Sequence, residues 1–534
     1  MKKTSTTKPD SAAVAAATGR PDSPPSRRDV LRGAGVIGIS ALTPGLGACG
    51  GDDAPADARF LHGVASGDPL PDGVILWTRV TTGASGDVTG TWEVATDPAL
   101  TTLVLSGDFS TSATRDHTVK VDVRGLSPGT TYHYRFRVGA AVSPVGRTRT
   151  APVGPVARAR FAVASCSSYA QGYFHAYRAL AARTDLDAVL HLGDYIYESG
   201  PGQFGSDRPH EPAREAITLA DYRTRHAQYK RDPDLQAVHQ QHPFITVWDD
   251  HETANNAWST GAENHQATEG AWADRKAAGQ RAYAEWMPIR DQADGTRIWR
   301  KLAWGDLADI VMLDTRLWAR TTSSAALAGP APQEVPGATI LGDDQEAWLA
   351  EQIVGSTATW KLIGQQVMVA NLILQPGMLV NLDQWHGYPA ARRRFLDSLG
   401  AMNRPNMVVL TGDLHTSWAN ELVVDPLDPA QYDPATGRGA VAVEFVTPGI
   451  TSPGLPPFYL PIVESARPFN PHLRWFDLVQ QGYMILDVTP ERTQAAWFLY
   501  ANIKQPVASP EQFVAAWSVK SGSTRLEADA APAP

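Results

Sequence analysis

The stretch LDAVLHLGDYIYES, residues 186–199, decides the fold class, because it joins a strand pattern to a set of polar side chains. Residues 186–192 are apolar and rich in strand-forming residues, which predicts a short buried strand. Gly193 ends this pattern, and Asp194 follows directly. Ligands of open α/β sheets bind beyond the carboxyl ends of the strands. The stretch therefore places Asp194 and Tyr197 where a site is expected.

The same pattern recurs through residues 160–503, where apolar runs alternate with helical stretches, as is typical of an α/β domain. We expect strands at residues 160–166, 188–194, 244–250, 309–315, 360–367, 407–413, 442–449, 483–489 and 494–500. We expect helices at residues 172–183, 219–229, 268–286, 343–353 and 389–400.

The flanking segments have other patterns. Residues 59–150 alternate apolar and polar positions between turn signals, which predicts a small antiparallel β-sandwich. Residues 151–159 form a Pro/Gly linker, and residues 504–534 are assigned to a C-terminal tail. The division therefore places a small all-β domain before the α/β domain.

Four of the expected strands end in residues that can bind metals. These are Cys166, Asp194, the run Asp249-Asp250-His251, and Asp413 with His415. A single Asp at a strand end is usually a turn or cap residue, but four such ends in one domain are hard to explain as caps. The sequence therefore predicts that these side chains share a site.

The first two strand ends favour a strong Lewis acid. Asp194 has a carboxylate that can bridge two cations, and Gly193 is expected to let a ligand approach closely. Tyr197 would bind only as a phenolate, which requires a cation such as Fe(III), since a phenol has a pKa of about 10. Cys166 would likewise bind as a thiolate.

The other two strand ends supply more donors. We expect Asp413 and His415 to lie in an extended stretch, with side chains on the same side and one facing each of two metals. In residues 247–258, two carboxylates precede His251. The imidazole could bind metal or donate a proton to a leaving group, and the acids could bind metal or orient the histidine.

Together these residues predict a site with two or more metals about 3.5–4 Å apart, which would generate a hydroxide nucleophile and hold a phosphoryl group for in-line attack. The chain of 534 residues has a formal net charge of −9, and no basic stripe is present. This argues against a nucleic-acid partner. Bound cations would let such an acidic chain hold a phosphate ester. We expect a monomer.

The N-terminal segment, residues 26–50, predicts export. Arg27 and Arg28 precede a Gly-rich apolar stretch that is too short for a membrane span and matches a twin-arginine signal. The sequence LGAC ending at Cys49 resembles a lipoprotein cleavage site, with residues 50–58 as a polar tether. The alternative is an ordinary signal with a chance cysteine. We expect the Tat export machinery as partner and a periplasmic or extracellular lipoprotein, anchored to the membrane through Cys49.

Three motifs carry a family resemblance. GDYIY (193–197), WDDHE (248–252) and TGDLH (411–415) resemble motifs of the calcineurin-like metallophosphoesterases, and more narrowly of the PhoD-type alkaline phosphatases. The resemblance extends from about residue 59 to about residue 500. It implies two mixed β-sheets flanked by helices, behind a small fibronectin- or Ig-like domain. It also implies hydrolysis of phosphomonoesters and phosphodiesters at alkaline pH with Fe(III) and Ca²⁺. The sequence itself leaves Zn²⁺ or Mn²⁺ open as alternatives.

The resemblance also implies roles for individual residues. Asp194 would bridge the metals, Asp413 and Asp250 would face calcium, and His251 would be the catalytic histidine. Asp250 is favoured over Asp249 because it precedes the histidine directly. The iron ligands would be Cys166, Tyr197 and His415.

The sequence does not decide the roles of four further residues. Gln365 or Gln366 could contact a metal through its amide or line the pocket. His386 stands where the resemblance leads us to expect an acid, and it is not assigned beyond a role in substrate access. Arg316 follows a strand end and could hold a phosphate oxygen or form a salt bridge.

Two other functions compete with the exported phosphatase. One is a phospholipase D-like or wall-polymer phosphodiesterase, which a lipid anchor at Cys49 would favour. The other is a surface binding module without enzymatic activity, in which the metals are structural. A complete set of open metal ligands argues against that module, because a structural metal does not need them.

Overall fold

The computed structural model describes residues 55–291, 296–322, 328–330 and 335–534. The twin-arginine segment and Cys49 lie outside these residues. Within the described ranges, no helix combines the length and apolarity that crossing a bilayer requires.

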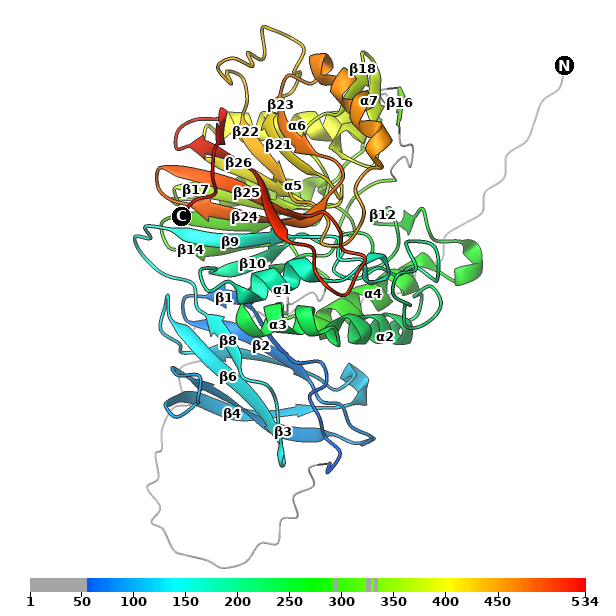
Figure 1. Ribbon diagram of the computed structural model, residues 1–534, viewed down its shortest axis with the longest axis vertical. Helices are drawn as coiled ribbons and strands as arrows, with labels where there is room; N and C mark the ends of the chain where they lie inside the picture. Colours follow the sequence, from blue (N-terminus) through cyan, green and yellow to red (C-terminus); the bar gives the residue numbers. More distant parts are fainter. Residues whose placement is uncertain (1–54, 292–295, 323–327, 331–334) are drawn as a thin grey trace, which may run out of the picture. The chain divides into compact units, whose positions relative to one another are not determined.

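A ten-stranded mixed sheet runs through the structure (Figure 1). Its strands, in spatial order, are β27 (Leu526–Asp529), β26 (Glu511–Lys520), β25 (Arg492–Tyr500), β24 (Gln481–Val488), β9 (Ala159–Ala164), β10 (Ala188–His191), β11 (Pro243–Thr246), β1 (Val64–Leu70), β2 (Gly73–Arg79) and β5 (Thr118–Arg124). The four strands β9, β10, β11 and β1 pair in parallel, and the outer strands are antiparallel. The carboxyl ends of the parallel strands therefore meet at one edge.

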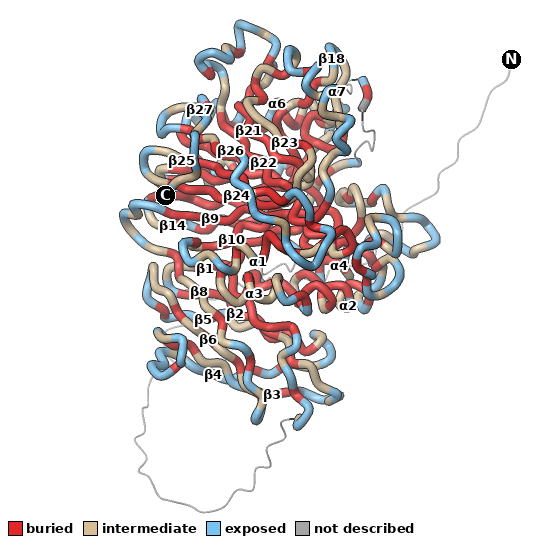
Figure 2. The backbone as a smooth tube through the Cα atoms, in the orientation of Figure 1, coloured by how far each residue is buried: buried red, intermediate tan, exposed pale blue. Residues whose placement is uncertain are grey.

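A seven-stranded mixed sheet packs against the first. Its strands, in spatial order, are β14 (Arg300–Trp304), β15 (Ala308–Met312), β17 (Trp360–Gln365), β20 (Met407–Thr411), β22 (Ala442–Val446), β21 (Ser417–Leu422) and β23 (Leu473–Asp477). The core between the sheets is aromatic: the Phe161 and Trp304 ring centroids lie 5.4 Å apart, and those of Phe445 and Trp497 lie 5.9 Å apart. Figure 2 shows buried residues running through both sheets.

Helices cover the outer faces of the two sheets (Figure 1). They are α1 (His175–Ala182), α2 (Leu219–Lys230), α3 (Pro233–Gln241), α4 (Trp272–Trp286), α5 (Gly342–Val354), α6 (Pro389–Ala401) and α7 (Leu460–Ser465). The start of α2 is fixed by a capping box, in which Thr218 and Asp221 bond reciprocally. The nine expected strands and five expected helices of the α/β domain are confirmed, which supports the predicted architecture.

The N-terminal segment forms a sandwich that shares a sheet with the α/β domain. One layer is β1, β2 and β5 of the ten-stranded sheet. The other contains β4 (Leu103–Thr111), β3 (Val88–Ala95), β6 (Thr131–Val138), β7 (Ala141–Val142) and β8 (Gly146–Arg149). Gly67 lets β1 pack closely beside β11, because a Cβ there would lie 2.6 Å from the Phe244 carbonyl oxygen. Strands β1, β2 and β5 of the N-terminal segment are therefore continuous with the large sheet of the α/β domain.

The assignment of residues 504–534 to a tail is wrong. Strands β26 and β27 lie there and form the edge of the ten-stranded sheet. Half of β26 is exposed, so the sequence carries little of the apolar pattern that marks the inner strands. Shorter strands complete the fold: β12 (Ala257–Trp258), β13 (Gly261–Ala262), β16 (Ala328–Pro330), β18 (Ile373–Gln375) and β19 (Met378–Val380).

Candidate metal centre

The four predicted strand ends come together. Cys166 follows β9, Asp194 follows β10 and residues 249–251 follow β11, all in the ten-stranded sheet. Asp413 and His415 follow β20 of the other sheet, so the site lies where the carboxyl ends of both sheets meet. The donor atoms form three overlapping groups: Cys166, Asp194 and His415; Asp194, Asp250 and His251; Asp249, Asp250 and Asp413.

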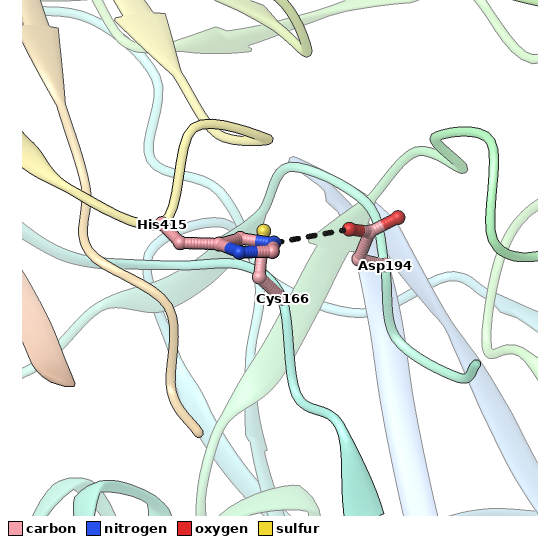
Figure 3. Close-up of side chains that lie close together, drawn as sticks. All are labelled: Cys166, Asp194 and His415. Carbon is pink, nitrogen blue, oxygen red and sulfur yellow. Dashed lines mark ion pairs between the residues drawn. The ribbon is translucent and has the colours of Figure 1, made fainter. Parts of the chain in front are cut away.

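The first group also contains Tyr197. In Figure 3 the Cys166 sulfur lies beside the His415 ring, and the Asp194 carboxylate points toward that ring. The Asp194 Oδ2 atom is 3.9 Å from His415 Nε2. The Tyr197 hydroxyl lies between them, 2.9 Å from the carboxylate and 3.1 Å from the imidazole nitrogen. These four side chains offer sulfur, oxygen and nitrogen donors to a single cation.

Asp194 connects the first group to the second. Within each group the donor atoms lie within 4.8 Å of one another. Ligands bonded to one metal at about 2.0–2.3 Å span a comparable distance. Asp194 belongs to two groups, as a bridging carboxylate requires, and Asp250 links the second group to the third. The spacing therefore fits more than one cation.

Four of the predicted ligand residues have left-handed backbone. The φ angles are 58° at Cys166, 53° at Asp194, 56° at Asp413 and 58° at His415. Each such residue stores about 1–3 kcal/mol of strain, and residues of this kind cluster at functional sites. The expectation that Asp413 and His415 lie in an extended stretch is wrong, because both have positive φ angles in a bent segment after β20.

Gly193 has a different role from the expected one. Its φ is +108°, and a Cβ there would lie 2.4 Å from the Asp249 Cβ and 2.6 Å from the Asp249 nitrogen. The segment that approaches Gly193 closely is therefore the chain after β11 at Asp249. Glycine is needed here to make room for that segment and not for a bound ligand. The absence of a side chain brings Asp194 and Asp249 together.

The protonation of the first group depends on a cation. Burial raises the pKa of Asp194 to about 8; the charge of His251 opposes this shift, and the carboxylates of Asp250 and Asp413 add to it. Burial and the charge of Asp194 raise the pKa values of Cys166 and Tyr197 well above their ordinary values. Thiolate and phenolate forms would therefore need a strong positive charge beside them. Burial lowers the pKa of His415 to about 4, which keeps its imidazole neutral, as a ligand must be.

Arg316 occupies the centre of the acidic side of the site. Its guanidinium is fully buried and lies 2.5 Å from Asp249 Oδ1, 2.5 Å from Asp413 Oδ1 and 2.5 Å from Asp383 Oδ2. Asp383 also pairs with Arg320, at 2.5 Å. The sequence left two roles open for Arg316, a contact with a phosphate oxygen or a salt bridge. The structure contains the salt bridge.

The carboxylates at the site fit additional cations. The Oδ2 atom of Asp249 is buried and has no hydrogen-bond partner in the described ranges. The charge of Arg316 is shared among several carboxylates, so it does not neutralise the cluster. The oxygen donors of Asp249, Asp250 and Asp413 suit a hard cation such as Ca²⁺, while the thiol, phenol and imidazole suit iron.

Glu198 is the residue that sequence analysis missed. Its Oε2 atom lies 2.7 Å from His251 Nδ1, and its Oε1 accepts a hydrogen bond from the Asn255 backbone. Burial lowers the pKa of His251, but the charges of Glu198, Asp250 and Asp194 outweigh it and raise that pKa well above its usual range. The only sequence signal was its place directly after Tyr197.

Glu252 has a structural role beside the site. Its carboxylate accepts hydrogen bonds from the backbone nitrogens of Asp194, Tyr195 and Asp249, at 3.2, 2.6 and 2.8 Å. It therefore joins the chain after β10 to the chain after β11 and fixes the positions of the predicted ligand residues.

The glutamines and His386 contribute to the surrounding framework. Gln365 bonds to Thr411 and Trp385, and the Gln366 amide bonds to Thr315 and Leu313. His386 Nε2 faces the backbone oxygens of Val380 and Asn381. Gln384, in contrast, donates to Asp413 Oδ2 at 2.6 Å. The amides of Gln365 and Gln366 are thus committed to the protein.

Comparisons with known proteins find a matching family and similar chains. Residues 161–497 match the family described as PhoD-like phosphatase, and residues 47–152 match its N-terminal domain. The chain is 37% identical over 513 residues to alkaline phosphatase D of Bacillus subtilis (strain 168), covering 90% of this chain and 86% of that protein. A solved structure described as "Structure of PhoD" matches with a TM-score of 0.82 and 34% identity, over 92% of this chain and 94% of that one.

Proposed function

The chain belongs to the PhoD-like phosphatase family, and we propose that it hydrolyses phosphate monoesters and diesters with water at the cluster around Asp194. The observation that carries the proposal is the convergence of three donor groups through Asp194 and Asp250. An arrangement of this kind suits phosphoryl transfer, in which positioning and charge stabilisation provide most of the catalysis.

We propose Fe(III) and Ca²⁺ as the cations. Cys166, Asp194, Tyr197 and His415 would hold the iron, and Asp194 would be shared with calcium. The remaining calcium ligands would be Asp250 and Asp413, with Asp249 as a second carboxylate within reach. When bound, the cations supply Lewis acidity, which offsets phosphoryl charge and promotes ionisation of water. Zn²⁺ or Mn²⁺ is the alternative.

His251 would protonate the leaving-group oxygen. Its Nδ1 faces Glu198, and its Nε2 has no hydrogen-bond partner in the described ranges. Glu198 holds the imidazole in one orientation and favours its protonated form. A protonated imidazole with one free N–H can donate to an oxygen that gains negative charge as the ester bond breaks.

Arg316 would act through the metal ligands. Its guanidinium bonds to Asp249 and Asp413 and is fully buried, so it supports the ligands and is unavailable to hold a phosphate oxygen directly. We therefore assign Arg316 the role of supporting the proposed ligands, in place of a direct contact with phosphate.

For the cellular location, we keep the proposal made from the sequence. Arg27, Arg28 and Cys49 support Tat export and a lipid anchor, and thus release of phosphate from extracellular esters.

Hydrolysis assays test the proposed function. The purified chain should hydrolyse p-nitrophenyl phosphate or bis(p-nitrophenyl) phosphate, lose activity on chelation and regain it with the cations restored. Asp194→Asn should lower kcat by at least about a hundredfold, because it removes the shared charge from both cations. A wild-type protein loaded with metal that hydrolyses neither ester would refute the proposal.

A further inference from the structure

The segment 449–453 lies beside the metal centre but supplies none of the predicted ligands. It follows strand β22 of the seven-stranded sheet, and Gly449 forms a parallel bridge with Ser165, which comes directly after β9 of the ten-stranded sheet. The Ser452 backbone nitrogen donates a hydrogen bond to the Cys166 carbonyl oxygen at 3.1 Å. The segment therefore connects the two sheets at the position of the first predicted ligand.

The last two residues of this segment contact two more of the predicted ligands. The Ser452 hydroxyl donates a hydrogen bond to the Tyr197 hydroxyl oxygen at 2.6 Å. The Pro453 carbonyl oxygen lies 3.2 Å from His415 Nδ1, and that nitrogen must donate, because a carbonyl oxygen only accepts. This leaves His415 Nε2, which points toward Asp194 in Figure 3, as the nitrogen available to a cation.

The backbone holds the Ser452 side chain in place. Ser452 is fully buried, and a Cβ on Gly449 would lie 2.6 Å from the Ser452 carbonyl oxygen, so the turn between them is tight. The Thr451 hydroxyl donates to the Ser168 carbonyl oxygen at 2.7 Å and anchors the preceding residue. The Ser452 hydroxyl is thus fixed against the phenol of Tyr197.

We propose that Ser452 is a positioning residue, whose hydroxyl holds the Tyr197 oxygen beside Asp194 and His415, where one cation can bind all three. This rests on the metal centre of the proposed function. The Tyr197 oxygen lies 2.9 Å from Asp194 Oδ2 and 3.1 Å from His415 Nε2. The serine donates to this oxygen whether or not the phenol carries its own hydrogen, because the oxygen is an acceptor in both forms.

The proposal predicts two effects of Ser452→Ala on the iron-loaded protein. Hydrogen-bond partners of metal ligands orient those ligands, and their removal lowers metal affinity about 10–100-fold. A tyrosinate oxygen that loses a hydrogen-bond donor also gives more electron density to the cation. The tyrosinate–Fe(III) charge-transfer band should therefore move to longer wavelength.

Thr451→Val is the matched control. Thr451 is fully buried in the same segment, but its hydroxyl bonds to a backbone oxygen and to no predicted ligand side chain. We would measure the Fe(III) affinity of the full-length wild type and of both variants by competition with a chelator, together with their visible spectra. Ser452→Ala should bind iron about tenfold to a hundredfold more weakly and show the shifted band, and Thr451→Val should keep the wild-type band.

The outcomes separate this inference from the proposed function. Wild-type affinity and band position in Ser452→Ala would overturn the positioning role. Equal losses of affinity with equal band shifts in both variants would also overturn it, because Ser452 would then only stabilise the segment. A wild type that takes up no iron would refute the iron assignment and this role together. A wild type that holds iron but hydrolyses no phosphate ester would refute the proposed function alone, because affinity and spectrum still decide the role of Ser452.

Discussion

The Nδ1 atom of His251 lies 2.7 Å from the Oε2 atom of Glu198, and both side chains are buried. This pair lies beside the proposed metal ligands, because residues 250 and 251 are adjacent in the chain after β11. Glu198 comes from the chain after β10, four residues beyond Asp194. The same two connections thus supply proposed metal ligands and the proposed proton donor.

Glu198→Gln should weaken the acid function of His251. The amide carries no charge, so the pKa of His251 should fall and the protonated form should be lost at lower pH. The alkaline limb of the kcat–pH profile should therefore move to lower pH, and kcat should drop about tenfold to a hundredfold.

The matched control for this change is Glu215→Gln. Glu215 accepts a hydrogen bond from Asn264, as Glu198 does, but it bonds to Arg275 and has no hydrogen bond to His251. An alkaline limb that stays in place in Glu198→Gln would show that Glu198 does not set the protonation of His251.

Arg316→Met should destabilise the protein. The substitution leaves the buried carboxylates of Asp249, Asp383 and Asp413 without their shared guanidinium. Removing one partner of a buried ion pair costs about 3–5 kcal/mol. Denaturant unfolding of the metal-free protein measures the change. Arg394→Met is the control, because its pair with Glu346 is partly exposed and worth about 0–1 kcal/mol. Equal losses in the two variants would contradict the role of Arg316.

Lys230→Met should change how stability depends on pH. Lys230 is buried, its Nζ lies 3.1 Å from His239 Nε2, and no carboxylate in the described ranges pairs with it. Burial lowers the pKa of Lys230 well below its usual value. Below pH 10.5 the unfolded lysine holds a proton that the folded lysine has released. Unfolding therefore takes up a proton, and stability rises with pH between the two pKa values.

The methionine variant should lose this slope. The difference in unfolding free energy between wild type and Lys230→Met should change by up to about 1.4 kcal/mol per pH unit in that range, with the variant favoured at lower pH. Urea unfolding at several pH values measures this difference. Parallel stability curves would mean that Lys230 keeps its proton in the folded protein.

Gly193→Ala should disrupt the contact between two ligand segments. The added methyl would meet Asp249 at 2.4 Å and would sit at a φ of +108°. Gly125→Ala is the control, with a φ of +87° but nothing within 4 Å. The control should lose about 1–3 kcal/mol from backbone strain alone, and Gly193→Ala should lose several kcal/mol and bind less metal. Similar losses of stability in Gly193→Ala and Gly125→Ala would rule out a steric effect at Asp249.

The sequence predicted the inner strands and the residues that follow them, because buried strands carry continuous apolar runs and their ends expose polar residues. It did not predict edge strands such as β26, whose exposed half carries no such run. It also did not reveal that Glu198 faces His251, because that contact depends on how two loops fold. Likewise, the contacts of Arg316 across both sheets have no local pattern.

The most direct test of the central claim, that Asp194 and Tyr197 belong to an iron site, is the visible absorption spectrum with an elemental count. Wild type should contain iron and show a tyrosinate–Fe(III) charge-transfer band. Tyr197→Phe should lose the band, because Tyr197 is the phenol whose oxygen lies 2.9 Å from Asp194 and 3.1 Å from His415. A colourless, iron-free wild type that still hydrolyses phosphate esters would contradict the iron assignment and favour Zn²⁺ or Mn²⁺.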